Sequence, residues 1–331
     1  MQTGYTLTIF SLLIFSWIRL TAQSGEVGPN YLLRFYEDND RYNLLSKTTD
    51  YAYTNGTQIN FYYTRENPSK FIVDQIMPGA GDQSINVLGW GLTQLMFTPA
   101  DITTSAYQAD DYPYAGALFI TRSVYSYNPF KKYDVQTELS LGVRGPAALA
   151  EEMQRFIHRF VGIPRAMGWY HQLSNKLYAN LNIKAEKGLA AIGKLEVIAG
   201  GQLFAGTMVN AVGLSSKIRF GIMAPYFNGF LTGYKAVLKT ANKKDIQIYL
   251  VVKPEIVYTF HDGLLTGEVN TAGGTKTKYR HNPSKFNYAL SGGVVIVYKK
   301  LGLSVSQNSS CVFLPGLYNH NAGNFSLYLS W

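Results

Sequence analysis

The residues best suited to chemistry lie in one stretch, GPAALAEEMQRFIHRF, at positions 145–160. At 100° per residue, a helix here places Glu151, Gln154 and His158 together on one face. A neutral imidazole can accept a proton at physiological pH, so His158 is a candidate general base. Gln154, one turn earlier, is a candidate for orienting either the histidine or a substrate.

The helical prediction for this stretch has two further supports. Pro146 stands where a first helical turn accepts a proline. An apolar stripe lies opposite the polar face and consists of Leu149, Met153, Phe156, Ile157 and Phe160. We therefore expect a short amphipathic helix inside a loop.

Three other polar clusters stand beside strand-like stretches: EDND at 37–40, YTNG at 53–56 and DDYPYAG at 110–116. Each has a simple structural explanation when taken alone. EDND is compatible with a loop entry, TNG with an Asn-Gly hairpin turn, and the aspartates before Pro113 with a turn. The other four histidines, His171, His261, His281 and His320, have no comparable setting, and we expect them at the surface.

The elements that would position these clusters read as strands. Polar and apolar residues alternate in YDVQTELSLGV (133–143) and in LYANLNIKAE (177–186). GNFSLYLSW (323–331) alternates up to a terminal aromatic residue and resembles the closing strand of bacterial outer-membrane barrels. Further strand candidates lie near 30–36, 53–63, 86–97, 114–127, 191–204, 212–222, 246–258, 288–299 and 301–307.

Composition agrees with a membrane barrel. Hydrophobic residues make up 47% of the chain and charged residues 15%, with 25 Tyr, 18 Phe and 31 Gly. After the N-terminal segment, no run reaches the ~18 apolar residues that a membrane helix requires. The sequence predicts an all-β fold, an antiparallel transmembrane β-barrel of about 12 strands with a short helix in an extracellular loop.

The N-terminal segment, residues 1–23, has the pattern of a secretory signal peptide, which leaves residues 24–331 as one barrel domain in the outer membrane. A single cysteine, Cys311, cannot form an intrachain disulfide. The net charge of +9 suits an anionic partner such as lipopolysaccharide. No basic helix or RNA-binding signature favours nucleic acid.

Strand alternation predicts where the polar clusters gather. The short turn NPFKK, 128–132, is typical of the periplasmic end of a barrel. The loops at 37–54, 98–112 and 145–160 then fall at the external rim. Strand parity puts Asp38 and Asp40 on one side of the wall and Asn39 on the other, and gives Thr54 the inward parity of Gln58.

Four blocks together resemble the outer-membrane lipid A 3′-O-deacylase family. They are DND (38–40), YTNG (53–56), DDYPYAG (110–116) and GPAALAEEMQRFIHRFVG with GWYHQL (145–162 and 168–173). The resemblance implies a twelve-stranded barrel that hydrolyses an ester-linked acyl chain of lipid A. It also implies calcium dependence and a site at the outer rim, among outer-membrane lipids.

The resemblance assigns roles to individual residues. His158 would be the base, and Asn39, Asp40 and Thr54 match the family's polar positions opposite it. Gln154 and Asp111 would bind or orient substrate. Ca²⁺ would polarise the ester carbonyl, and the candidates for holding it are Asp38, Asp40 and Glu151. No serine stands in a G-x-S-x-G elbow, which favours water as the nucleophile.

One position departs from the family pattern. Pro164 stands where some members carry an acidic residue shortly after the histidine. Its presence keeps open a noncatalytic barrel, either a pore or a structural or surface protein. A third alternative is an outer-membrane phospholipase, for which a serine beside a histidine in the wall is expected. The sequence does not indicate the oligomeric state or which acyl chain is removed.

Overall fold

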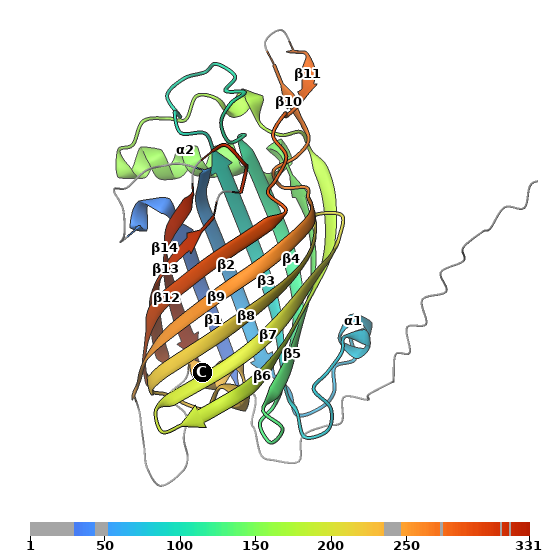
Figure 1. Cartoon of the computed structure of the whole chain (residues 1–331), viewed down its shortest axis with the longest axis vertical. Helices are drawn as coiled ribbons and strands as arrows, with labels where there is room; N and C mark the ends of the chain where they lie inside the picture. The colour runs from blue at the N-terminus through green and yellow to red at the C-terminus, as the bar shows by residue number, and fades with distance from the viewer. Residues whose placement is uncertain (1–29, 44–51, 235–245, 272–273, 312, 318) are drawn as a thin grey trace, which may run out of the picture.

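A computed structural model describes residues 30–43, 52–234, 246–271, 274–311, 313–317 and 319–331. The predicted signal peptide at 1–23 lies outside these residues. The fold is a closed barrel of twelve antiparallel strands, as predicted, with a separate two-stranded hairpin (Figure 1).

The barrel strands follow one another around the wall, and β1 pairs with β14 to close it. Their bounds are β1 (Tyr31–Asn39), β2 (Ala52–Thr64), β3 (Ile85–Thr98), β4 (Ala115–Asn128), β5 (Tyr133–Arg144), β6 (Lys176–Ile192), β7 (Leu195–Gly206), β8 (Val209–Ile222), β9 (Ile246–Asp262), β12 (Phe286–Tyr298), β13 (Leu301–Ser310) and β14 (His320–Ser330). The hairpin consists of β10 (Glu268–Asn270) and β11 (Lys276–Lys278). All twelve predicted strands are present.

Apolar side chains cover the outside of the wall. Ile59, Leu92 and Ile120 are paired across β2, β3 and β4, and they are 47%, 45% and 54% exposed. Paired residues in an antiparallel sheet point to the same face, so this row identifies the lipid-facing side. Among the described residues, no helix is long and apolar enough to cross a membrane.

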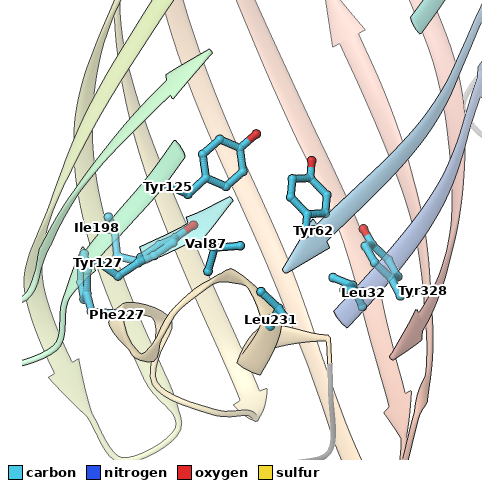
Figure 2. Close-up of a cluster of buried hydrophobic side chains, with 9 residues drawn as sticks. All are labelled: Leu32, Tyr62, Val87, Tyr125, Tyr127, Ile198, Phe227, Leu231 and Tyr328. Atoms are coloured by element: carbon cyan, nitrogen blue, oxygen red, sulfur yellow. The ribbon is translucent and has the colours of Figure 1, made fainter. Parts of the chain in front are cut away.

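The lumen is filled near the end away from α2 (Ala150–Val161). The connection after β8 folds into η4 (Tyr226–Asn228) and α3 (Phe230–Gly233). Its Phe227 and Leu231 join Tyr62, Tyr125 and Tyr127 of the wall in one buried cluster (Figure 2). Side chains of the wall and of this connection therefore pack together inside the barrel at this level.

The helix predicted at 145–160 is present and lies at the upper end of the barrel in Figure 1. It divides into η2 (Pro146–Ala148) and α2, because Leu149 between them adopts a left-handed conformation with φ 57°. The loop after β3 and the residues before β4 pack against it through Ile102 and Tyr114. The short helices η1 (Asp40–Tyr42) and η3 (Trp169–His171) lie at the same end. The predicted gathering at one rim is confirmed.

Candidate functional site

A row of paired residues crosses the outer face of four strands near this rim. Asn39 pairs with Asn55, Asn55 with Met96, and Met96 with Gly116. These residues share the parity of the lipid-facing Ile59 row, so they point outward. The row therefore gives the wall a polar outer patch at β1 and β2 and an apolar one at β3 and β4.

The helix α2 packs directly on this row. A Cβ atom at Gly116 would come within 2.3 Å of the Ala150 Cβ, so only glycine permits such close approach. Gln94, which also points outward, donates a hydrogen bond of 2.7 Å to the carbonyl of Ala148. The candidate site thus lies outside the barrel, between the wall and a helix, and not in the lumen.

The face of α2 turned to the protein carries the predicted polar pair. Gln154 and His158 are 3% and 7% exposed. The Nδ1 atom of His158 lies 2.7 Å from the carbonyl oxygen of Pro164. A carbonyl accepts only, so Nδ1 carries the proton and Nε2 is left with a lone pair.

The amide of Gln154 is oriented by Trp169. The indole Nε1 donates a hydrogen bond of 2.6 Å to Gln154 Oε1. An indole N–H is a donor only, so the oxygen of Gln154 must face it. The Nε2 group of Gln154 is then buried with no hydrogen-bond partner within the described part of the chain. A buried donor of this kind costs stability unless a ligand uses it.

Trp169 is itself held by Tyr114. The two rings lie 5.0 Å apart between centroids, and both are buried. Burial raises the pKa of Tyr114 to about 12, so its hydroxyl stays neutral at physiological pH. Tyr114 therefore holds Trp169 in place without introducing a charge beside Gln154.

The apolar stripe of α2 points away from the protein. Leu149, Met153, Phe156 and Phe160 are 54%, 42%, 69% and 85% exposed. In a water-soluble protein such a stripe would face the core. The reversed orientation is the one expected for a helix whose outer side meets acyl chains.

Residues at the ends of β1 and β2 extend the polar patch. Glu37 accepts hydrogen bonds from Asn55 and, at 2.7 Å, from Thr57, all on the outer face. Asp40, the first residue of η1, is 2% exposed. Because β1 ends at Asn39, the chain turns at Asp40 and strand parity no longer applies to it.

Two other predicted site residues, Asp38 and Thr54, are not shown beside α2. Asp38 points into the lumen, where the Tyr36 hydroxyl donates to its carboxylate at 3.0 Å, so the wall separates it from α2. A β-bulge between Tyr53 and Asn55 interrupts the alternation that predicted an inward Thr54. The side chain of Thr54 lies outside the described residues, and its role stays a prediction.

Two acidic residues have local partners. Glu151 forms ion pairs with Arg155 at 2.5 Å and Arg165 at 3.6 Å. Asp111 accepts hydrogen bonds from the backbone N–H groups of Ala100 and Tyr112 at 2.8 and 2.7 Å. These contacts hold Glu151 to residues within and after α2, and Asp111 to the backbone of the loop before β4.

Two neighbouring residues at the rim, Asn39 and Asp40, carry side-chain oxygens of the kind that a hard cation binds. No group of three or more His, Cys, Asp or Glu side chains in the described ranges is arranged to hold a metal. Ca²⁺, however, accepts amide and backbone oxygens beside one or two carboxylates. Asp40 is a deeply buried carboxylate next to the outward Asn39, and this pairing has the chemistry that Ca²⁺ prefers.

Some features differ from the sequence predictions. TNG is not a hairpin turn, since Asn55 and Gly56 lie inside β2. His171 and His320 are buried rather than at the surface, and His171 contacts the carbonyls of Asn270 and Ser105. Trp169 was not predicted as a site residue, although GWYHQL belongs to the motif blocks and a buried indole needs an acceptor.

Comparisons with known proteins identify the family and the fold. The model of the family "Outer membrane protein LpxR" matches residues 7–331. LpxR from Salmonella typhimurium superposes with a TM-score of 0.71 at 14% identity, covering 90% of this chain and 99% of that one. The translocator domain of the autotransporter NalP from Neisseria meningitidis gives a TM-score of 0.43 at 6% identity, covering 91% and 88%.

No curated protein sequence matches the chain. The structural likeness to LpxR shows the fold, and the family model spans nearly the whole sequence. The chain belongs to the LpxR family of outer membrane proteins, the lipid A 3′-O-deacylase family that its motifs resemble.

Proposed function

We propose that this protein hydrolyses an ester-linked acyl chain of lipid A at the 3′ position, with His158 as the general base. The observation that carries the proposal is the position of the buried Gln154–His158 pair on the outer side of the wall, on the inner face of a helix whose apolar stripe faces outward. Catalytic groups that act on a membrane lipid must be reachable from the membrane. A site on the outer side of the wall meets this requirement.

His158 is oriented for proton transfer. With Nδ1 donating to the Pro164 carbonyl, Nε2 can take a proton from a water molecule as that water attacks the ester carbonyl. Pro164, the position at which the resemblance implied an acidic residue, offers its backbone oxygen as an orienting acceptor for the imidazole. The departure at Pro164 therefore leaves the base in a usable tautomer.

Gln154, predicted to bind or orient substrate, would stabilise the developing oxyanion. Its Nε2 group has no hydrogen-bond partner in the described residues, and Trp169 prevents the amide from turning. A donor fixed in advance and shielded from water is an effective stabiliser of a tetrahedral intermediate. Asp40 and Asn39 would hold Ca²⁺, which, when bound, polarises the ester carbonyl.

The alternatives have less support. A pore is disfavoured by the cluster around Phe227 and Leu231 that fills the lumen. A serine-dependent phospholipase would place a serine beside the catalytic histidine, whereas the side-chain contact described for His158 is with Pro164.

The decisive test is mass spectrometry of lipid A after incubation with the purified protein in detergent, with Ca²⁺ or with a chelator. We expect loss of one acyl or acyloxyacyl mass with Ca²⁺, no loss with the chelator, and no loss for His158→Ala. His261→Ala, an exposed histidine on β9, is the matched control and should retain activity.

Two results would contradict the proposal. Unchanged lipid A from both its own source and a standard source, with folded protein, would support a noncatalytic barrel. Hydrolysis of phospholipid alone would support the phospholipase.

A further inference from the structure

A second site lies on the outside of the wall at the end away from α2. Here β1 begins and β2 ends, and a groove of about 470 Å³ opens between the wall and the start of the connection to β3. Tyr31, Phe61 and Tyr63 line it on the wall side, and Arg65, Glu66 and Asn67 line it on the other. The C-terminal residue Trp331 lies at the same end of the barrel (Figure 1), because it exchanges backbone hydrogen bonds of 3.1 Å with Tyr31 of the groove.

The wall side of the groove is a stack of aromatic rings. Phe61 lies 5.9 Å from Tyr31 and 5.7 Å from Tyr63 between ring centroids, with interplanar angles of 11° and 27°. Trp331 extends the stack, 5.7 Å from Tyr31. These residues have the outward parity of Ile59, so the stack belongs to the aromatic girdle at the periplasmic interface of the membrane. The rings offer a rigid apolar surface for the glycerol and upper acyl region of a lipid.

The other side of the groove carries one cation and one anion. Arg65 and Glu66 are consecutive and exposed, and neither forms an ion pair or hydrogen bond with the described residues. Asn67 adds an amide. A guanidinium suits a phosphate because it donates two parallel hydrogen bonds, and a carboxylate suits an ammonium. Side by side, the two match a zwitterionic head group better than an anionic one.

We propose that this groove binds one glycerophospholipid of the periplasmic leaflet whose head group is a phosphoethanolamine. Its phosphate is held by Arg65, its ammonium by Glu66, and its glycerol and upper acyl chains lie against Phe61 and Tyr63. The inference is independent of the candidate catalytic site, which lies at the opposite end of the barrel.

Native mass spectrometry of the full chain in detergent tests the assignment. The protein is titrated separately with phosphatidylethanolamine and with phosphatidylglycerol, whose head group has the phosphate but no amine. We expect one tightly bound phosphatidylethanolamine, preferred about tenfold over phosphatidylglycerol, as expected for one charge-assisted hydrogen bond. Equal, weak binding of several molecules of both lipids would mean annular lipid only and would overturn the proposal.

Two variants separate the two charges. Arg65→Gln should weaken both lipids, and Glu66→Gln should abolish the preference for phosphatidylethanolamine while leaving phosphatidylglycerol binding unchanged. Lys70→Gln, an exposed residue of the same connection outside the groove, is the matched control. Undiminished binding by Arg65→Gln, or an unchanged preference in Glu66→Gln, would contradict the proposed head-group contacts.

Discussion

Two helices pack on the outer face of the barrel wall at β3 and β4, one near each end of the barrel. The two regions differ in how far the hydrogen-bonding groups of their buried polar side chains are satisfied. Near the end away from α2, the connection after β2 forms α1 (Ile72–Ile76). Arg122 points outward from β4 and donates to both carboxylate oxygens of Asp74 in α1, at 2.7 and 2.5 Å. It also donates to the Gly89 carbonyl and the Tyr63 hydroxyl.

Near the other end, α2 packs on the wall and buries its own Gln154 and His158. Here the partners are fewer, since Trp169 occupies only the oxygen of Gln154 and the Pro164 carbonyl only one nitrogen of His158. Arg122 and Asp74, at 4% and 0% exposed, are as deeply buried as the Gln154–His158 pair. Burial is therefore not what distinguishes the two regions.

The difference lies in unused hydrogen-bonding capacity. A charged side chain on the lipid-facing wall destabilises a barrel by about 2–4 kcal/mol near the midplane of the membrane. Asp74 of α1 offsets this cost because it pairs with the charge of Arg122 and accepts its hydrogen bonds. A buried donor without a partner destabilises the fold, and a ligand that accepts its hydrogen bond would offset that cost. We therefore interpret the α1 region as a structural clamp and the α2 region as a site.

The largest expected effect is on catalysis. His158→Ala should lower the rate of lipid A deacylation by about 10²–10⁴-fold, because general-base catalysis contributes about that factor. Its unfolding midpoint in urea should stay close to that of the wild type. A matching loss of stability would mean that His158 is a structural residue like Arg122.

The clamp should show the opposite behaviour. Asp74→Ala should lower the free energy of unfolding by about 3–5 kcal/mol, because it leaves Arg122 buried without its counter-charge. Deacylation by the folded fraction should be retained. Adding Arg122→Leu should restore much of the stability, and a double variant as unstable as the single one would contradict the clamp interpretation.

Gln154→Leu sharpens the comparison further. Loss of one oxyanion donor should lower kcat by about 10²–10³-fold with little change in KM. The variant removes the unpartnered donor of Gln154 but also leaves the buried Trp169 N–H without its acceptor, so its unfolding midpoint should stay close to that of the wild type. A rise in KM with unchanged kcat would indicate ordinary substrate binding instead.

The smallest effect is expected from Trp169→Phe. The ring and its packing on Tyr114 remain, but the N–H group that holds the Gln154 oxygen is lost. Steady-state kinetics should show a fall in kcat of about tenfold or less, as for one hydrogen bond. Trp90→Phe replaces an exposed indole on the wall and is the control, and its kcat should equal that of the wild type.

The strands were predictable because the wall enforces a period of two. Val135, Leu141 and Phe325 were expected on the lipid side, and the register confirms this parity. The helix at 145–160 was predictable from its stripe. The segments 72–76 and 226–233 were missed, since each is too short to show a period and is ordered by contacts with distant strands.

The candidate site was predictable only in part. The identity of Gln154 and His158 as one helical face follows from sequence spacing, whereas Trp169 joins them through a contact across 15 positions. Asp38 and Asn39 separate onto opposite faces as parity predicted. The bulge at Thr54 depends on how β2 pairs with β3 and has no local signal.

By itself, the sequence determined the class of fold, the outward faces of the strands and the amphipathic helix, because each is a local period that any partner would preserve. The tertiary structure decided that α2 turns its polar face to the wall, that Pro164 supplies a carbonyl to His158, and that Gln154 keeps a donor unused. These outcomes depend on the register of β1 to β4 and on glycine at position 116. In a water-soluble protein the apolar stripe of an amphipathic helix is buried in the core. In a membrane protein the lipid takes the place of that core, so the apolar stripe of α2 lies on the outside.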